Sequence, residues 1–450
     1  MVDVMLRDGG SGSTSRKLGG YEFYREVLGS PKFVVAPMVD QSELAWRILS
    51  RKYGAQLVYT PMISAKTFAV PHAGDKFRKK VFDMIHGEEG GAEDRPLIVQ
   101  FCANDPEALL AAAQIVEPFC DAVDINLGCP QDIARKGRYG SFLQDDWDLV
   151  YSLINILHEN LRIPVTAKFR VLPSVERTVA YAQMMERAGA QILTCHGRTR
   201  DQRGHNSGLA DWAQIAAVKR AVSVPVFANG NVLYWEDVER CLEATGADGV
   251  MSAEGNLYNP ALFARTNPAH WTLALEYLEI VKQLKTRTPP SAIKGHVFKL
   301  LRPALEGNKD LRNKIGAISG RGELEDVVKE YEDVVREFGE RMERDAGAAG
   351  DAEEGKIGPL LDGKRHIPHW LAQPYFRPGP PPAQQKPAAV KAPPASALPP
   401  LSTGGEQSAL PAPLAEVEMG PDKPEREELK RKNSSLEERE AKRVREVSPV

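Results

Sequence analysis

The sequence predicts an α/β fold: a (β/α)8 TIM barrel followed by a small all-helical domain and a disordered C-terminal tail. Eight short apolar segments alternate with amphipathic helical patterns over about 225 residues, which is the repeat of such a barrel. From residue 271 to about 342 only helical patterns follow. Composition then changes, because 17 of the 33 prolines come after residue 358, and this change predicts the tail.

The strand-like segments are short and rich in β-branched residues, as buried parallel strands are. They span 32–38, 55–62, 96–102, 122–128, 164–170, 192–198, 225–231 and 249–255. Helical patterns with an apolar residue every three or four positions lie between them, for example at 42–53, 106–119, 147–161, 176–189 and 235–246. A doubly wound open sheet is the main alternative to the barrel.

The chain divides into four expected parts. A polar N-terminal arm, 1–30, ends in a short helical pattern that we expect to pack against the barrel, 31–270. The helical domain covers 271–345, and the Pro/Ala-rich, charged tail covers 346–450. Within the tail, the stretch 360–378 contains three aromatic residues and is expected to dock on the body.

The end of the tail contains two basic clusters, 430–432 and 442–445. Their spacing suits a nuclear-import signal or a helix that contacts RNA, and a charged tail without function is an equal alternative.

Composition limits the partners and the cellular compartment that the protein can have. A formal net charge of −3 gives no overall attraction to nucleic acid, so such binding needs local basic patches. The five cysteines form no C-x-x-C pair and have no histidines at zinc spacing, which predicts no metal site and a reducing compartment. No apolar run approaches the ~18 residues that span a bilayer. We therefore expect a soluble monomer in the cytoplasm or nucleus, without membrane contact.

Polar residues end nearly every predicted strand. In a barrel these strand ends form one rim, where catalytic residues lie, whereas a scaffold alone predicts apolar or turn residues there. The rim residues are Pro37, Met38, Met62, Gln100, Asn126, Cys129, Lys168, Arg170, His196, Arg198, Asn229, Gly230, Ser252, Ala253 and Glu254. We therefore expect the functional site at this rim.

Cys129 directly follows a predicted strand. The loop after it contains Arg135, Lys136 and Arg138 among glycines, which favours an anionic partner held close to the backbone. The alternative is that Cys129 is one more small, buried, apolar side chain. Glycine-containing turns also follow the seventh and eighth strands, where barrels commonly bind phosphate through backbone N–H groups. With the polar rim, these turns indicate a large, planar, phosphorylated ligand.

A set of short motifs resembles the tRNA-dihydrouridine synthase family. The motifs are APM (36–38), VQF (99–101), NLGCP (126–130), AKFR (167–170), HGRTR (196–200), NGN (229–231) and AEG (253–255), in family order over about 32–305. APMVDQSELAWR and YTPMISAKTF are most similar to the eukaryotic branch that reduces uridines 16 and 17 of the tRNA D-loop. The resemblance implies an FMN-binding barrel, NADPH or NADH as reductant, and an RNA-binding helical domain.

The resemblance also implies residue roles. It places FMN on Ala36, Pro37, Met38, Gln100, Lys168, His196, Asn229, Gly230, Asn231, Ala253 and Glu254. Many relatives have Gly-Arg at the last two positions, so Ala-Glu here leaves only backbone N–H groups for the phosphate. Cys129 matches the family's proton donor. Asn126, Arg170 and Arg198 match substrate positions, and His196 also lies near the uracil.

The chemistry fits these residue types. Reduction of the uracil C5–C6 double bond takes a hydride at C6, which reduced flavin can deliver, and a proton at C5. A thiol with an ordinary pKa of about 8.5 is protonated at neutral pH and can supply that proton. A lysine near the flavin stabilises its reduced, anionic form, although Lys168 could instead extend from a strand end into water.

The helical region has a local excess of positive charge. Nine Lys and Arg lie between 282 and 314, against Glu306 and Asp310 alone. This predicts a track for tRNA phosphates, with Lys294, Lys299 and Arg302 as substrate contacts, and a merely solvated face is the alternative.

Two other functions are open at this stage. One is a small-molecule pyrimidine or dihydroorotate-type FMN oxidoreductase, which would lack a basic helical appendage. The other is an RNA-binding barrel without catalysis, which would not need Cys129, Lys168 and His196 together.

Overall fold

The computed structural model describes residues 16–71, 73–204, 207–350, 352, 355–360 and 364–376. The N-terminal fifteen residues and the basic clusters at 430–432 and 442–445 lie outside the described residues. In the described part, no helix has the length and apolar character needed to cross a membrane.

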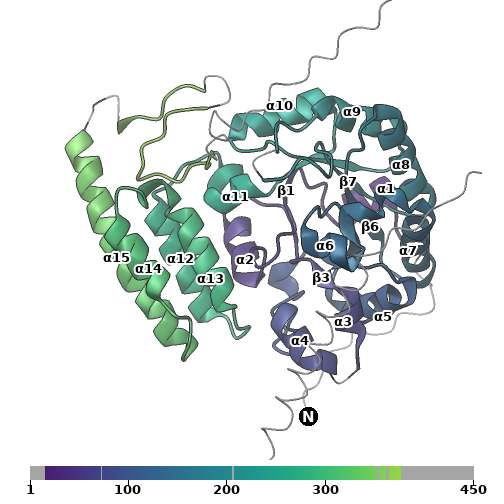
Figure 1. The fold of residues 1–450 in the computed structure, drawn as a ribbon, viewed down its shortest axis with the longest axis horizontal. Coiled ribbons are helices and arrows are strands. Elements are labelled where there is room, and N and C mark those ends of the chain that lie inside the picture. The colour runs from purple at the N-terminus through teal and green to yellow at the C-terminus, as the bar shows by residue number, and fades with distance from the viewer. Residues whose placement is uncertain are drawn as a thin grey trace, which may run out of the picture. The chain divides into compact units, whose positions relative to one another are not determined.

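Eight parallel strands close into the predicted barrel (Figure 1). They are β1 (Phe33–Val35), β2 (Leu57–Tyr59), β4 (Leu97–Cys102), β5 (Ala122–Leu127), β6 (Val165–Arg170), β7 (Leu193–His196), β8 (Val226–Asn229) and β9 (Gly249–Ser252). Each strand pairs with its neighbours in the chain, β1 pairs with β9, and β2 pairs with β4. A two-residue strand, β3 (Ile63–Ser64), adds to β4. The prediction of a barrel is confirmed, and the doubly wound sheet is excluded.

Helices cover the outside of the barrel. They are α1 (Gly20–Glu26), α2 (Leu44–Lys52), α3 (Ala65–Ala69), α4 (Ala73–Val81), α5 (Pro106–Val116), α6 (Asp132–Gly137), α7 (Trp147–Asn160), α8 (Val175–Arg187), α9 (Trp212–Ala221), α10 (Trp235–Thr245) and α11 (Glu254–Tyr258). Several begin where a side chain caps the free N–H groups of the first turn. These capping side chains belong to Asp105, Asp146, Ser174 and Asp211.

The N-terminal arm closes the end of the barrel opposite the rim. Phe23 and Tyr24 of α1 are buried against barrel residues that include Phe227, and the Tyr24 hydroxyl donates to the Asp248 carbonyl oxygen at 3.0 Å. Asp248 lies just before β9, at the amino end of the strands. The carboxyl-end rim is therefore the open end of the barrel.

The helical domain consists of α12 (His270–Gln283), α13 (Pro290–Leu300), α14 (Lys309–Ala317) and α15 (Leu324–Ala349). Figure 1 shows these helices side by side, next to α2 and α11 of the barrel. Trp46 and Leu49 of α2 belong to the same apolar core as Tyr277 and Val297. Because barrel and helices share this core, their relative position is fixed by burial of apolar surface.

A segment after α15 also docks, as predicted for this part of the tail. Residues 364–376, here called the C-terminal strap, form an antiparallel bridge between Leu371 and Ala269. The Ala372 amide donates to the Pro268 carbonyl at 2.8 Å, and Ala372 is completely buried. The helical part itself extends to Ala349 rather than ending at 345.

A buried polar cluster joins barrel and helical domain. Glu43, just before α2, accepts a hydrogen bond from the Tyr277 hydroxyl at 2.7 Å, and its other oxygen lies 3.0 Å from His296 Nε2. The His296 ring stacks on Trp46 with centroids 3.9 Å apart. Burial alone raises the pKa of Glu43, but attraction to His296 and the hydrogen bonds from His296 and Tyr277 outweigh it, so its pKa is lowered.

We predict that this cluster makes stability depend on pH. Since folding lowers the pKa of Glu43, its contribution is present above the unfolded carboxyl pKa of about 4.3 and is lost as pH falls through the folded value. Glu43→Gln should lower Tm at pH 7 by roughly 3–8 °C, with the difference from wild type shrinking toward pH 4. Differential scanning fluorimetry, with the exposed Glu279→Gln as control, measures this. A constant difference across pH would contradict it.

Candidate active site

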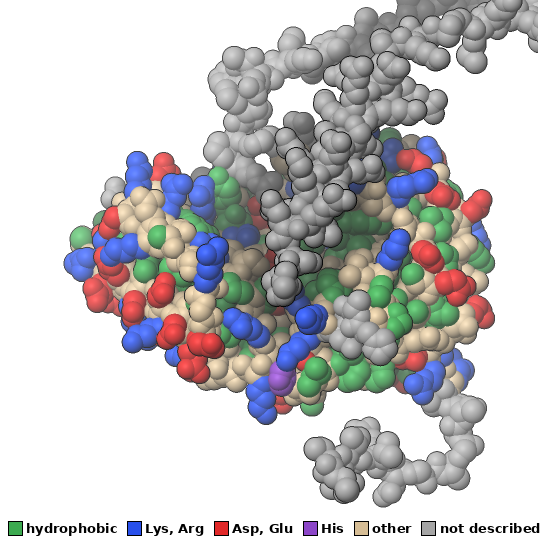
Figure 2. Space-filling view, turned by 60° about the horizontal axis from the view of Figure 1, so that its bottom comes forward, with side chains coloured by type: hydrophobic (Ala, Val, Ile, Leu, Met, Phe, Trp, Pro, Cys, Tyr) green, Lys and Arg blue, Asp and Glu red, His purple; other side chains and the backbone are tan. Residues whose placement is uncertain are grey.

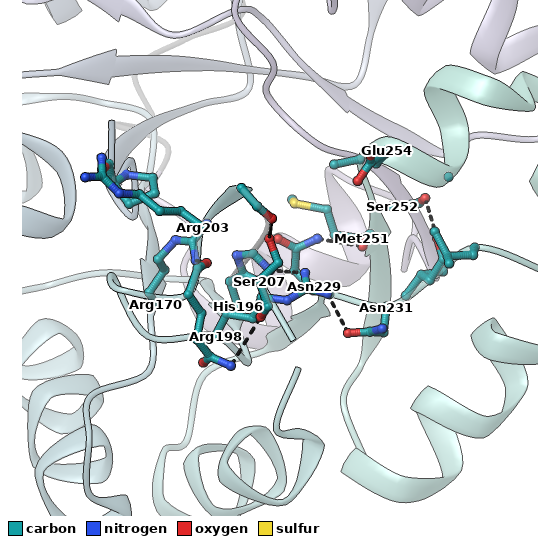
Figure 3. A pocket seen from close by; sticks show the side chains of 18 of the residues that line it. Arg170, His196, Arg198, Arg203, Ser207, Asn229, Asn231, Met251, Ser252 and Glu254 are labelled. Atoms are coloured by element: carbon teal, nitrogen blue, oxygen red, sulfur yellow. Dashed lines mark hydrogen bonds between the residues drawn. The ribbon is translucent and has the colours of Figure 1, made fainter. Parts of the chain in front are cut away.

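A cavity of about 750 Å³ opens at the carboxyl ends of the later strands. Its described lining comes from the carboxyl ends of β6 to β9, from the segments after β5, β7, β8 and β9, and from Tyr375 of the C-terminal strap. In Figure 3, Arg170, Arg198 and Arg203 lie on the left of this cavity, and Asn231, Ser252 and Glu254 lie on the right. A volume of this size is within the range of cofactor sites.

A hydrogen-bond chain runs across the barrel interior to the cysteine loop. Asp124 accepts from the Gln100 side-chain amide at 2.8 Å and from the Thr166 hydroxyl at 2.6 Å. The Gln100 carbonyl oxygen accepts from the Asn126 amide at 2.8 Å, and Asn126 Oδ1 accepts the backbone N–H of Cys129 at 2.9 Å. The buried carboxylate thereby fixes the orientation of both amides and of the loop that holds Cys129.

Cys129 is half-buried at the start of this loop. The Ser141 hydroxyl donates to its carbonyl oxygen at 3.0 Å. Gly140, with φ +67°, packs so closely that a Cβ there would lie 2.7 Å from the same oxygen. The glycine therefore allows the loop to fold tightly around the thiol.

Lys168 provides a cation beside the cavity. Its Nζ donates to Asn229 Oδ1 at 2.9 Å, and the Asn229 amide donates to the Met251 carbonyl at 2.8 Å. Desolvation lowers the pKa of Lys168 to about 8, Arg170 adds to the shift, and Asp124 opposes it. Burial raises the pKa of Asp124 to about 6. Desolvation thus moves the two pKa values toward each other, and the attraction between the two charges opposes both shifts.

Two arginines tie the rim loops together. Arg170 donates to the Gly128 carbonyl at 2.8 Å and to the Thr199 carbonyl at 3.0 Å, joining the loops after β5 and β7. Arg198 donates to Asn231 Oδ1 at 2.7 Å and lies 3.2 Å from His196 Nε2. Desolvation, with Lys168, Arg170 and Arg198 nearby, lowers the pKa of His196 well below its ordinary value. His196 is therefore a neutral imidazole at pH 7.

The loops after β8 and β9 approach the cavity with their backbone. Gly230 has φ +114°, and a Cβ there would lie 2.7 Å from the Ala210 side chain and 2.9 Å from His196 Cδ2. A Cβ at Gly255 would lie 2.3 Å from the Val232 carbonyl oxygen. Larger side chains do not fit at either position. Both glycines also line the cavity, so their backbone borders it without a side chain, as expected from the sequence for a phosphate-binding turn.

The structure divides the predicted site residues into three groups. Those that line the cavity are Arg170, His196, Arg198, Asn229, Gly230, Asn231, Ala253 and Glu254. Those on the rim but outside the cavity's described lining are Ala36, Pro37, Met38, Gln100, Asn126, Cys129 and Lys168. Those in the helical domain are Lys294, Lys299 and Arg302. The roles given to all of them stay predictions.

The three helical-domain cations differ in what they contact. Lys294 donates to the carbonyls of Gly316 and Ile318 at the end of α14, at 2.8 and 2.9 Å, which occupies it inside its own domain. The Lys299 ammonium donates to the Gln41 side chain. Arg302 is exposed and lies over the ring of Tyr375 at 4.2 Å.

Sequence reasoning missed Asp124, Thr166 and Tyr375. Asp124 lies two residues before Asn126 on a strand, so period-two alternation could have placed both side chains on the inner face. Thr166 alternates in the same way with Lys168. Tyr375 had no such signal, because only the folded chain brings the strap to the cavity.

Comparison with known proteins agrees with this geometry. Residues 34–339 match the family model described as dihydrouridine synthase. A rat tRNA-dihydrouridine(16/17) synthase-like protein is 49% identical over 366 residues, covering 81% of this chain and 78% of the relative. The Saccharomyces cerevisiae tRNA-dihydrouridine(16/17) synthase is 47% identical over 378 residues, covering 81% and 87%. A human tRNA-dihydrouridine(20a/20b) synthase-like protein is 38% identical over 256 residues, covering 56% and 77%.

We predict that Asp124 holds the barrel interior together. Asp124→Leu leaves the buried donors of Gln100 and Thr166 without an acceptor, which should cost about 2–5 kcal/mol of unfolding free energy. Asp124→Asn can still accept from Gln100, while the Thr166 hydroxyl can turn to accept, so it should cost clearly less. Urea unfolding of both variants measures the difference. Equal stability of Asp124→Leu and wild type would contradict this role.

Proposed function

The chain belongs to the dihydrouridine synthase family, and on this basis we propose that it reduces uridine to 5,6-dihydrouridine in tRNA, at positions 16 and 17 of the D-loop. The enzyme is an oxidoreductase that uses FMN, and NADPH or NADH reduces the flavin again after each turnover. One structural observation supports the proposal most: Cys129 is held by Asn126 at the same rim as Lys168 and the cavity.

The residues of the site suit FMN. The cavity of about 750 Å³ is lined after β8 and β9 by Gly230 and Gly255, whose backbone can face a phosphate, and Lys168 supplies a desolvated cation. FMN, when bound, supplies the hydride that reaches C6 of the uracil ring. Lys168 would hold the cofactor together with His196, Asn229, Gly230 and the loop after β9.

The protein's own residues supply the proton that is added at C5 of the uracil ring. We assign the proton transfer to the Cys129 thiol: a C–H bond forms at C5 as the S–H bond breaks, and the thiolate then takes a proton from solvent. Asn126 positions Cys129 through its backbone N–H. Arg170, which spans the loops after β5 and β7, positions the substrate uracil next to that thiol.

The small-molecule alternative fits less well. A dihydroorotate-type oxidoreductase has no need of a helical domain that shares a core with the barrel, whereas a tRNA enzyme does. The relatives with high identity over most of the chain are also named for tRNA.

We propose that tRNA contacts the exposed cations of the helical domain. Figure 2 shows that basic side chains on this domain, at left, are interspersed with acidic ones. Lys282 pairs with Glu279 and Glu332, and Lys314 pairs with Glu337. Lys309 and Arg312 of α14 are exposed and have no ion pair with a described residue. These two are the best placed to bind phosphate.

Two further expectations belong to the same proposal. The enzyme acts as a monomer, and it works in the cytoplasm or nucleus, where tRNA is available. All five cysteines are free, which is consistent with a reducing compartment.

We predict that Cys129→Ala keeps its FMN but loses turnover on tRNA by about 10²- to 10⁴-fold, because only the proton donor is removed. Flavin content, NADPH oxidation and dihydrouridine formation are measured separately. Cys102→Ala, which removes a nearby thiol whose pKa burial raises to about 12, is the control and should retain turnover. Turnover at the wild-type rate in Cys129→Ala would remove this residue from the mechanism.

We predict that the double reversal Lys309→Glu/Arg312→Glu weakens tRNA binding and flattens its salt dependence. If each cation meets one phosphate, the slope of log affinity against log salt should fall by roughly 1.4–1.8. Arg187→Glu/Arg220→Glu makes the same charge change on exposed residues at the carboxyl ends of α8 and α9, on the side opposite the rim. Equal effects of the two pairs in filter-binding titrations would argue against a specific track.

A further inference from the structure

The C-terminal strap lies beyond the residues that match the family model, 34–339, yet it reaches the cavity. Its backbone is held by the segment just before α12, through the Ala269–Leu371 bridge and the Asn267 side chain, which donates to the Ala372 carbonyl at 2.8 Å. Arg365 of the strap donates to Glu236 of α10 at 2.8 Å. Barrel and helical domain therefore both anchor this segment.

Tyr375 is the strap residue that lines the cavity, together with residues 252–255 of the loop after β9. Two contacts hold its ring: Tyr258 of α11 lies at a centroid distance of 5.7 Å, and the Arg302 guanidinium lies 4.2 Å from the ring centroid. Among the described residues, the Tyr375 hydroxyl has no hydrogen-bond partner, so it can still donate to a ligand.

The loop after β9 has no basic side chain of its own that could bind an anion. The loop after β9 presents Ala253 and Glu254, so the barrel places an acidic side chain, and no basic one, at this loop where a phosphate is expected. Arg302 adds positive charge from the helical domain, directly behind the Tyr375 ring. An anion near residues 252–255 would therefore be stabilised from outside the barrel.

We propose that the C-terminal strap completes the cofactor site, with Tyr375 as a contact of the FMN phosphate and Arg302 as the residue that positions its ring. The inference rests on the proposed use of FMN. A nucleobase stacked on Tyr375 is the competing reading, but Arg302 already covers the ring, and the neighbouring cavity residues are those of the expected phosphate loop. The cofactor therefore fits the observations better than RNA.

The test compares FMN with riboflavin, which lacks the phosphate. Full-length protein is stripped of flavin, and the dissociation constants of both flavins are measured by quenching of flavin fluorescence in wild type, Tyr375→Ala, Tyr375→Phe and Arg302→Gln. Phe376→Ala is the matched control, since Phe376 is the next aromatic residue but packs on Tyr234 rather than lining the cavity.

We expect Tyr375→Ala and Tyr375→Phe to weaken FMN roughly ten- to hundredfold with little change for riboflavin, because a hydrogen bond to a charged group is lost. Arg302→Gln should weaken FMN less, and Phe376→Ala should leave both constants unchanged.

Equal weakening of FMN and riboflavin in Tyr375→Ala, or unchanged FMN binding with weaker tRNA binding, would overturn the inference. If Phe376→Ala has the same effect as Tyr375→Ala, strap docking rather than a phosphate contact is responsible, and the inference also fails. Wild-type protein that binds neither flavin would instead refute the proposed function.

Discussion

The buried Asp124 carboxylate is the constraint on which the barrel mouth depends. A carboxylate in the barrel interior must be hydrogen-bonded, and the Gln100 amide and the Thr166 hydroxyl meet that need. Once Gln100 donates to Asp124, its carbonyl faces Asn126, and Asn126 in turn faces the backbone of Cys129. The thiol is therefore positioned from beneath by a chain of hydrogen bonds that begins at the buried carboxylate. The same carboxylate opposes the fall in the pKa of Lys168.

Much of this arrangement could be predicted from the sequence. Every predicted strand forms, because short β-branched segments between amphipathic helices have few other stable arrangements. The polar residues at strand ends could be assigned to one rim as soon as the barrel was predicted, because parallel strands end on the same side. Asp124 was missed because an acidic residue in a buried strand needs hydrogen-bond donors, and the sequence does not show that Gln100 and Thr166 supply them.

The basic helical region shows where sequence reasoning stops. The number of positive charges between 282 and 314 predicted a phosphate track. In the fold, however, Lys294 donates to a carbonyl at the end of α14, and Lys282 and Lys314 form ion pairs with acidic residues of α12 and α15. Which cations stay available depends on helix packing. The C-terminal strap is a similar case. Tyr375 reaches the cavity only because Leu371 pairs with Ala269, about a hundred residues earlier in the chain.

We infer that the enzyme reduces uridine within tRNA rather than a free pyrimidine. The most direct measurement is reoxidation of the flavin in the purified, NADPH-reduced enzyme, followed by absorbance without oxygen. Unmodified tRNA should restore the oxidised spectrum and gain dihydrouridine at positions 16 and 17, whereas free uridine and uracil should not. Reoxidation by free uracil or uridine as fast as by tRNA would contradict this inference and favour a small-molecule oxidoreductase.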